Sequence, residues 1–271
     1  MRSRLNKFLA QAGLGSRRKV EELVTAGLVT VNGTLVTDLA TTVDPQGDSV
    51  KVGGKRVRPR DLYYYAFHKP KNVVTTLDDP EGRPSVDRYL RRLPPGLKPV
   101  GRLDYASEGL ILLTSDGDWA QSIQHPTKKV EKIYQVKVRG VPDPRALERW
   151  HKGLTLDGKR ARMEKVELLK STEADNTWLT VVLTQGMTRQ IRRMCETLGH
   201  PVMKLKRTAI GRVLLGGLKP GEARELTERE IRSFNPESAA ATVEQRPAPG
   251  RGKAGGSKAG WARPRQRPVK R

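Results

Sequence analysis

The strongest constraint on the fold is a short apolar run, LILLT at residues 110–114, which follows a glycine-bracketed loop and precedes the turn residues 115–117. A continuous apolar run of this length, bounded by turn residues, is typical of a strand that is buried inside a sheet. We therefore expect residues 110–114 to form an internal strand of a domain that has its own hydrophobic core.

Further strands and helices alternate irregularly across residues 61–235. Alternating or continuously apolar segments predict strands at 63–67, 110–114, 134–138, 166–169 and 178–183. Helical spacing of apolar residues predicts helices at 119–125, 145–152 and 189–198. No glycine-rich phosphate loop follows a strand, and no repeat period is present. This order favours an α+β domain, built on a mostly antiparallel mixed sheet with flanking helices, over a doubly wound nucleotide-binding fold.

Residues 1–60 are predicted to form a small separate unit. Apolar residues at helical spacing indicate one helix that ends at Gly13 and a second that Ser16 can cap. An Asn-Gly turn at 32–33 then joins two β-prone arms.

The charge of the chain points to a polyanionic partner. It has 52 Lys and Arg against 29 Asp and Glu, a formal net charge of +23 over 271 residues. Each phosphate that a cation neutralises releases counterions, so nucleic acid is the partner that such a charge favours. Residues 17–19 are all cationic at the start of a predicted helix, where they oppose the helix dipole unless a phosphate docks there. We expect RNA contacts from a cluster on the two N-terminal helices: Arg4, Lys7, Arg17, Arg18 and Lys19.

The last segment, residues 236–271, consists mainly of Pro, Gly, Ala, Arg and Lys, with nine basic residues against two glutamates. It lacks the apolar surface that would offset the entropy of ordering, so we expect a disordered basic tail. An electrostatic tether to RNA and a solubility tail are both open interpretations of this segment.

Several classes of protein are excluded by the sequence. No apolar run approaches the roughly 18 residues that cross a bilayer, which excludes a membrane protein. Residues 1–4 lead into an amphipathic stretch and not an apolar signal core, so we expect a cytoplasmic protein. A single cysteine, Cys195, and four scattered histidines argue against a disulfide framework and a metal site. We expect no cofactor and no metal.

Three sequence elements are candidates for chemistry, and the first is the loop GRLDYASEG at residues 101–109. Asp104 stands there at the entrance to the buried strand, where a carboxylate is partly desolvated. Such a carboxylate needs a cationic or hydrogen-bonding partner. An aspartate that caps a turn is the alternative interpretation.

The second element is KIYQVKV at residues 132–138. If it is a strand, Tyr134 shares one face with Val136 and Val138. Its ring then lies either in the core or in the wall of a cleft, where the ring can stack and the hydroxyl can transfer a proton. A core tyrosine with its hydroxyl at the surface is the alternative.

The third element is the predicted helix 189–198. Its buried stripe is predicted to consist of Ile191, Met194, Cys195 and Leu198. Arg192 lies at the edge of that stripe, from which it can reach a half-buried carboxylate, whereas Arg193 points away and suits solvent or phosphate. Cys195 on the apolar stripe is interpreted as a packed small residue and not as a nucleophile.

These elements carry a family resemblance. The stretch RLNKFLAQAGLGSRRKVEELVTAGLVTVNG, residues 4–33, resembles the αL RNA-binding motif of a small-subunit ribosomal protein, some tRNA synthetases and several RNA-modifying enzymes. Together with GRLDYASEGLILLTSDG, KIYQVKV and the third element, the chain up to about Phe234 resembles the pseudouridine synthases of the RsuA/RluB branch. The segment DPEGRPSV at 79–86 is more similar to the large-subunit rRNA member of that branch than to the small-subunit member.

The resemblance implies an rRNA pseudouridine synthase, an isomerase that detaches the uracil, rotates it and rejoins it through a ring carbon. It implies that Asp104 is the catalytic carboxylate, that Tyr134 stacks on the base and mediates proton transfer, and that Arg192 holds Asp104 ionised through a bidentate pair. The target uridine has to leave its stack to reach Asp104. Further RNA contacts are expected from Lys69, Arg83, Arg102, Arg189 and Arg193.

One departure from the family pattern concerns the first arginine of the third element. The family usually has an acidic residue, Gly and Arg before this element, where the present chain has Gln185-Gly186-Met187. Because of this departure, the resemblance gives less support for a role of the first arginine of the third element. It leaves the role implied for Arg192 unchanged.

Two non-enzymatic functions compete with this hypothesis. One is a non-catalytic rRNA-binding ribosome assembly factor, and the other is a general polyanion binder that acts through the tail. We favour the enzyme, and we expect it to act as a monomer on large-subunit rRNA or its precursor.

Overall fold

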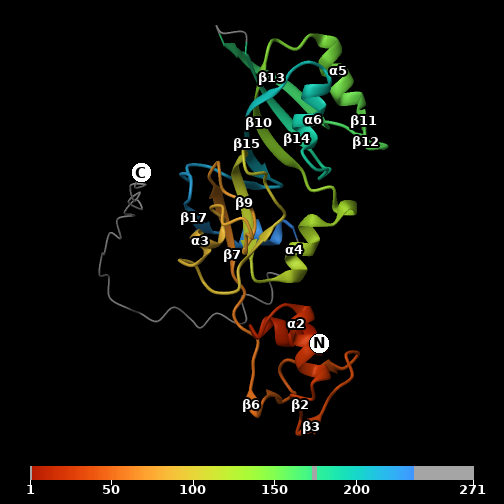
Figure 1. The fold of residues 1–271 in the computed structure, drawn as a ribbon, viewed down its shortest axis with the longest axis vertical. Helices are drawn as coiled ribbons and strands as arrows, with labels where there is room; N and C mark the ends of the chain where they lie inside the picture. Colours follow the sequence, from red (N-terminus) through yellow and green to blue (C-terminus); the bar gives the residue numbers. More distant parts are fainter. Residues whose placement is uncertain (1, 173–175, 235–271) are drawn as a thin grey trace, which may run out of the picture.

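The computed structural model describes residues 2–172 and 176–234. The predicted disordered tail, 236–271, lies outside these residues. The described part is elongated, with the N-terminal elements at one end and one large sheet running through the rest (Figure 1). In this part of the chain no helix is long and apolar enough to cross a bilayer.

The N-terminal part combines two short helices with a small sheet. The helices are α1 (Leu5–Gln11) and α2 (Arg17–Thr25), and the Ser16 side chain accepts a hydrogen bond from the Lys19 main-chain nitrogen at 3.2 Å, which confirms the predicted cap. Asn32 and Gly33 have φ values of 52° and 87°, as a tight hairpin turn requires. The strands are β2 (Val29–Val31), β3 (Thr34–Leu35), β5 (Val50–Val52) and β6 (Lys55–Arg56) in the order β3-β2-β5-β6, with β1 (Ser3–Arg4) paired to β4 (Thr42–Val43).

The rest of the described chain is built on one nine-stranded mixed sheet in the order β13-β14-β10-β15-β9-β7-β17, with β16 paired to β15 and β8 paired to β9. Its strands are β7 (Tyr64–Lys69), β8 (Lys98–Val100), β9 (Glu108–Thr114), β10 (Lys132–Arg139), β13 (Lys165–Thr172), β14 (Asn176–Leu183), β15 (Val202–Ile210), β16 (Val213–Leu214) and β17 (Ala223–Glu225). A separate hairpin consists of β11 (Leu154–Leu156) and β12 (Lys159–Ala161). The mostly antiparallel α+β architecture predicted from the sequence is confirmed.

Helices cover both faces of this sheet, which explains why β9 is continuously apolar. Ile111 and Leu113 face a cluster that includes side chains of three helices: α3 (Asp87–Leu90), α5 (Pro144–Lys152) and α6 (Gln190–Thr197). Leu110 and Leu112 face the opposite cluster, to which α4 (Gly117–Gln124) and α7 (Glu228–Arg232) contribute. The internal position predicted for residues 110–114 is therefore correct.

Strands β15 and β9 form the joint between the two halves of the sheet. In the described residues this is the only parallel pairing between strands of the sheet, and it is two residues long: Lys206 lies opposite Glu108, and Arg207 lies opposite Gly109. A Cβ atom at Gly109 would lie 2.2 Å from the Arg207 carbonyl oxygen, and the φ of Gly109 is +114°. Only glycine fits this position without strain, because the Arg207 main chain occupies the space of a side chain.

The nine-residue strand β15 is absent from the sequence prediction. Lys204, Lys206 and Arg207 interrupt its apolar residues, so no long apolar run identifies it. The alternation becomes clear in the structure, where Leu205, Arg207 and Ala209 are all buried. Strand β15 therefore has the alternation of buried and exposed residues that is typical of a strand, but one of its buried positions is occupied by an arginine.

Candidate active site

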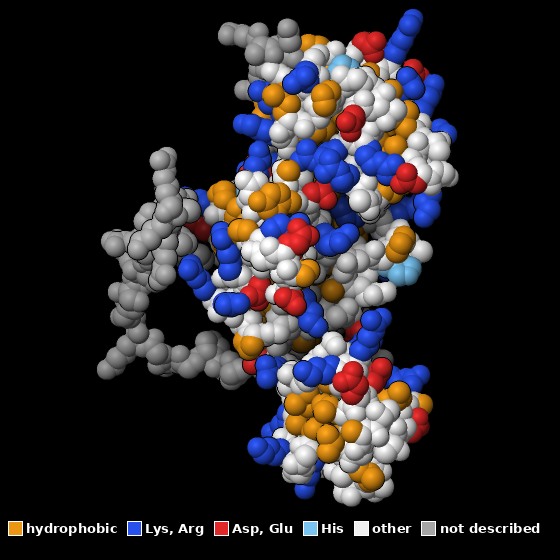
Figure 2. All heavy atoms as spheres, in the orientation of Figure 1, with side chains coloured by type: hydrophobic (Ala, Val, Ile, Leu, Met, Phe, Trp, Pro, Cys, Tyr) orange, Lys and Arg blue, Asp and Glu red, His pale blue; other side chains and the backbone are white. Residues whose placement is uncertain are grey.

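A cavity of about 980 Å³ opens where the two halves of the sheet meet, and Asp104, Tyr134 and Arg207 all line it. The cations that line it were partly predicted, since Arg102 and Arg189 are among them. Six others were not singled out from the sequence: Lys129, Lys132, Lys152, Arg160, Arg162 and Arg207. On the face drawn in Figure 2, Lys and Arg side chains gather where the upper and middle parts of the molecule meet.

Asp104 lies on a loop that neighbouring main chain holds in place. Its carbonyl oxygen accepts a hydrogen bond from the Ser107 nitrogen at 3.0 Å, which closes a turn directly before β9. The Thr75 hydroxyl donates to the Leu103 carbonyl oxygen at 2.8 Å and accepts from the Leu103 nitrogen at 3.2 Å. The Asp104 side chain itself is half-buried in the cavity wall.

Lys69 corrects one prediction, because the structure places it in the core and not at the RNA surface. Its side chain is 0% exposed, and the ammonium group donates to the carbonyl oxygens of Pro70 at 2.8 Å and Val73 at 2.7 Å. These residues precede Thr75, so Lys69 braces the segment that holds the Asp104 loop. Burial lowers the pKa of Lys69 to about 8, while Asp104 and Glu108 act in the opposite direction.

This buried lysine predicts a pH-dependent stability. Its pKa is lower in the folded chain than in the unfolded chain, so between about pH 8 and its ordinary pKa the unfolded chain binds the extra proton. Raising the pH through this window therefore stabilises the folded state. We expect the free energy of unfolding, measured by urea denaturation from about pH 7.5 to about pH 10, to rise more in the wild type than in Lys69→Met. Lys98→Met, at an exposed lysine, is the control and should keep the wild-type slope. Equal slopes for the wild type and Lys69→Met would contradict the assignment.

Tyr134 and Arg207 face each other across the β10–β15 ladder. The register shifts between Ile133 and Tyr134, so that Ile133 lies opposite Ala209 and Tyr134 lies opposite Arg207. Tyr134 is 8% exposed and Arg207 is 4% exposed. The Arg207 guanidinium donates from Nε to the Leu110 carbonyl oxygen at 2.7 Å and from Nη1 to the Tyr134 hydroxyl at 3.5 Å. The sequence left two positions open for Tyr134, the core or the wall of a cleft, and the structure shows both, because Tyr134 packs in the core cluster and lines the cavity.

Arg192 lies close to the Asp104 loop, but the predicted bidentate pair with Asp104 is not formed. Its guanidinium donates to the Ala106 carbonyl oxygen and the Ser107 hydroxyl, both at 3.3 Å, and to the Val202 carbonyl oxygen at the same distance. Burial lowers the pKa of Arg192, as does Arg189, while the Asp104 charge raises it. Arg192 therefore holds the loop directly and attracts the Asp104 carboxylate through space.

The other predicted RNA contacts fall into three groups. The first group is exposed: Arg102 and Arg189 at the cavity, and Arg4, Arg17, Arg18 and Lys19 on the N-terminal part, away from the cavity lining. Lys7 forms an ion pair with Asp118, which Arg17 also approaches at 3.9 Å. Two arginines are already neutralised: Arg83 pairs with Asp79 and Glu81, and Arg193 forms a bidentate pair with Asp157.

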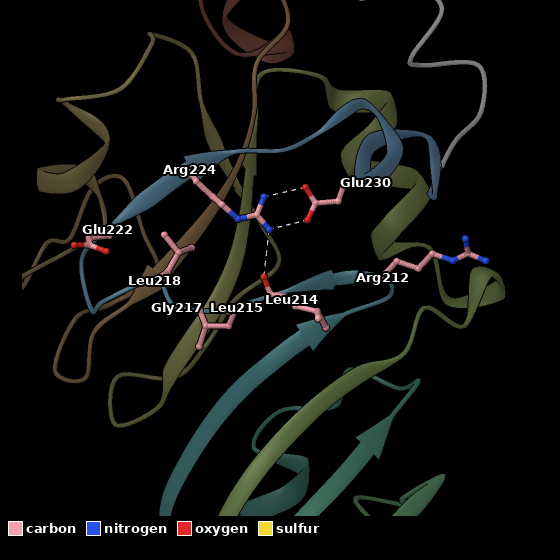
Figure 3. A pocket seen from close by; sticks show the side chains of 9 residues that line it. Arg212, Leu214, Leu215, Gly217, Leu218, Glu222, Arg224 and Glu230 are labelled. Carbon is pink, nitrogen blue, oxygen red and sulfur yellow. Dashed lines mark hydrogen bonds and ion pairs between the residues drawn. The ribbon is translucent and has the colours of Figure 1, made fainter. Parts of the chain in front are cut away.

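Cys195 and a second pocket lie outside the lining of this cavity. Cys195 is buried, and burial raises the pKa of its thiol to about 12, as expected for a packed residue. In the described residues no group of three or more His, Cys, Asp or Glu side chains could hold a metal ion. A second, smaller pocket lies beside β16 and β17, where Arg224 forms a bidentate pair with Glu230 and donates to the Leu214 carbonyl oxygen (Figure 3).

Comparisons with known proteins agree with this arrangement. Residues 63–197 match the family model described as RNA pseudouridylate synthase, and residues 3–50 match the S4 domain. The chain is 38% identical, over 84% of its length and 94% of the relative, to the ribosomal large subunit pseudouridine synthase B of Bacillus subtilis. It is 40% identical, over 85% of its length and 93% of the relative, to an uncharacterized RNA pseudouridine synthase of Aquifex aeolicus. A crystal structure of a pseudouridylate synthase aligns with a TM-score of 0.57 at 27% identity, covering 85% of this chain and 99% of that one.

Proposed function

The chain belongs to the RNA pseudouridylate synthase family, and from this premise we propose that it converts one specific uridine of large-subunit rRNA, or of its precursor, into pseudouridine, with Asp104 as the catalytic carboxylate. Membership of a family of enzymes favours this function over a non-catalytic assembly factor and over a general polyanion binder. The likeness to a large-subunit enzyme supports the choice of rRNA subunit.

The observation that carries the proposal is the meeting of Asp104 and Tyr134 in one cationic cavity. Asp104 comes from the loop before β9 and Tyr134 from β10, which belongs to the other half of the sheet. Both line the same cavity, together with eight Lys or Arg residues and with Glu164 as the second carboxylate. A carboxylate, an aromatic ring and a cationic rim are the groups that a single extruded nucleotide requires.

The reaction breaks one bond to the ribose and makes another. The bond between ribose C1′ and uracil N1 breaks, and its electron pair leaves with the ring. The Asp104 carboxylate assists on the sugar side, either by bonding to C1′ or by accepting the C2′ proton. The ring then turns and C5 bonds to C1′, while the bond between Asp104 and C1′ breaks or, in the second case, Asp104 returns the proton to C2′. The proton lost from C5 is balanced by the proton gained at N1. The Tyr134 ring stacks on the base, and its hydroxyl mediates the proton transfer.

The target uridine has to leave its stack, at a cost of a few kcal/mol that contacts to the flanking nucleotides offset. Arg102 and Arg189 at the rim of the cavity are suited to bind the phosphates of these flanking nucleotides, because both side chains are exposed. The N-terminal S4 domain offers a second cationic surface, from Arg17 to Lys19 at the start of α2. That this domain docks on the rRNA, and that the protein acts as a cytoplasmic monomer, stay predictions.

Removing the two rim charges should weaken RNA binding without removing the chemistry. We expect the double variant Arg102→Gln/Arg189→Gln to bind its rRNA fragment several-fold more weakly and to lower the slope of log affinity against log salt by about 1 for each lost phosphate contact. Fluorescence anisotropy over a series of salt concentrations measures both quantities. The control is Arg229→Gln/Arg232→Gln on α7, whose residues do not line the cavity. An unchanged slope in the rim variant would contradict the proposed phosphate contacts.

The direct test of the function uses unmodified transcripts of large-subunit and small-subunit rRNA. We expect the purified protein to form pseudouridine at one position of the large-subunit transcript, read out by pseudouridine-specific chemical modification and primer extension. Formation in the small-subunit transcript alone would overturn the choice of subunit. No pseudouridine in either transcript, or in the corresponding precursor particles, would overturn the activity.

A further inference from the structure

Arg207 is a buried cation at the centre of the sheet, and the role assigned to it below rests on the proposed function. Arg207 lies on β15, between β10 and β9, at the joint of the two sheet halves (Figure 1). Its guanidinium bridges all three strands, because Nε bonds to Leu110 on β9 and Nη1 to the Tyr134 hydroxyl on β10. It also lies 6.0 Å from the centre of the Tyr134 ring.

The local backbone is built to hold this side chain. Thr208 is the extra residue in the bulge of β15, since Ile133 lies opposite Ala209 while Tyr134 lies opposite Arg207. Such bulges re-aim side chains and are frequent next to active sites. On the other side, Gly109 lets the Arg207 main chain approach closer than any side chain would allow. The bulge and the glycine together bring Arg207 into the wall of the cavity.

Within residues 2–172 and 176–234, no carboxylate lies within ion-pair distance of the Arg207 guanidinium. Among the same residues, its Nη2 atom is buried without a hydrogen-bond partner. An unpaired buried charge is costly, so its persistence calls for an explanation in the function. Burial lowers the pKa values of both Lys69 and Lys132, and the positive charge of Arg207 lowers them further.

A negative charge arises at this place during the reaction. When the bond between C1′ and N1 breaks, its electron pair moves onto the uracil ring and spreads over N1 and the two carbonyl oxygens. The base that stacks on Tyr134 holds this charge beside the Arg207 guanidinium, in a cavity where electrostatic interactions are stronger than in water. We propose that Arg207 is a catalytic residue that binds the detached uracil and neutralises its developing negative charge.

The decisive comparison is between a variant that keeps the charge and one that does not. We expect Arg207→Gln to lower the single-turnover rate of pseudouridine formation about 10²- to 10³-fold, with the dissociation constant for RNA within about threefold of the wild type. Arg207→Lys should recover at least about tenfold of that loss. Arg224→Gln is the matched control, since Arg224 is a half-buried arginine of the same sheet in the second pocket (Figure 3), and it should stay within about threefold of the wild-type rate. Equal rates for the Lys and Gln variants, or a normal rate for Arg207→Gln, would overturn the proposal.

A double-mutant cycle separates this role from mere support of Tyr134. If Arg207 acted only by orienting the Tyr134 hydroxyl, Arg207→Gln would cost nothing further in a Tyr134→Phe background. We expect it to cost at least about tenfold more there, because the charge acts on the base. No additional loss would overturn the catalytic role.

A measurement on the wild-type protein covers the case in which Arg207→Gln does not fold. The probes are 5-nitrouracil, whose ring is anionic near neutral pH, and the neutral rings uracil and thymine. We expect the anion to inhibit at least about tenfold more strongly than either neutral ring, and equal inhibition would overturn the proposal. Absence of pseudouridine with the wild-type protein would refute the proposed function itself, whereas a normal rate in Arg207→Gln refutes only the role of Arg207.

Discussion

Replacing Asp104 by Asn is expected to abolish pseudouridine formation, with a fall of at least about 10⁴-fold in the single-turnover rate, as is usual when a catalytic group is removed. The amide has the shape of the carboxylate but neither bonds to C1′ nor accepts a proton from C2′. The loop should keep its place, because the contacts that hold it come from main-chain atoms, from Thr75 and from Arg192, and not from the Asp104 carboxylate. RNA affinity should therefore stay within about twofold.

Asp78→Asn provides the control for this variant. Asp78 is an exposed aspartate of the preceding loop that does not line the cavity, so the same change of charge there should leave the rate unchanged. A substantial residual rate in Asp104→Asn would contradict the role of Asp104. A parallel loss of rate and of RNA affinity would show that the carboxylate serves binding and not chemistry.

Replacing Gly109 by Ala should have the largest effect on stability, because two penalties add. The new Cβ would lie 2.2 Å from the Arg207 carbonyl oxygen and 2.6 Å from the Arg207 nitrogen, and both are main-chain atoms that cannot swing aside. The φ of +114° is also unfavourable for any residue with a side chain. We expect a loss of about 3–5 kcal/mol in the free energy of unfolding, measured by chemical denaturation.

Gly216→Ala separates the two penalties. Gly216 also has a positive φ, +57°, but a Cβ there meets no atom within 4 Å. It should therefore lose only about 1–2 kcal/mol, the cost of the backbone conformation alone. A Gly109→Ala variant as stable as Gly216→Ala would show that the two sheet halves do not meet as tightly as the structure has them.

The fold was predictable where apolar patterning was continuous. The strand at 110–114 and the capped helix α2 follow from local spacing and turn residues, and both are found in the structure. Of the stripe predicted for α6, Ile191, Met194 and Cys195 are buried, whereas Leu198 follows the last residue of the helix and is half-buried. Strand β15 was not predictable in the same way, because its inward-facing positions include a charged residue, Arg207. Local patterns do not reveal a charge that long-range packing buries.

The candidate site was predictable in its members but not in their contacts. The sequence identified Asp104, Tyr134 and Arg192, and the structure brings the first two to one cavity while Arg192 holds the Asp104 loop. The burial of Lys69 was missed, because a lysine next to a proline reads as a surface residue until tertiary contacts enclose it. The pairing of Arg83 and Arg193 with carboxylates was missed too, and for Arg193 the partner, Asp157, is distant in sequence.

The central claim, that this chain isomerises one uridine of large-subunit rRNA through Asp104, is tested most directly in the cell. The measurement is a map of pseudouridines in the rRNA of a strain that lacks the gene, compared with the same strain carrying either the wild-type chain or Asp104→Asn. We predict that one pseudouridine of the large-subunit rRNA disappears on deletion, returns with the wild type and stays absent with Asp104→Asn. An unchanged map after deletion, or restoration by the Asp104→Asn chain, would contradict the account.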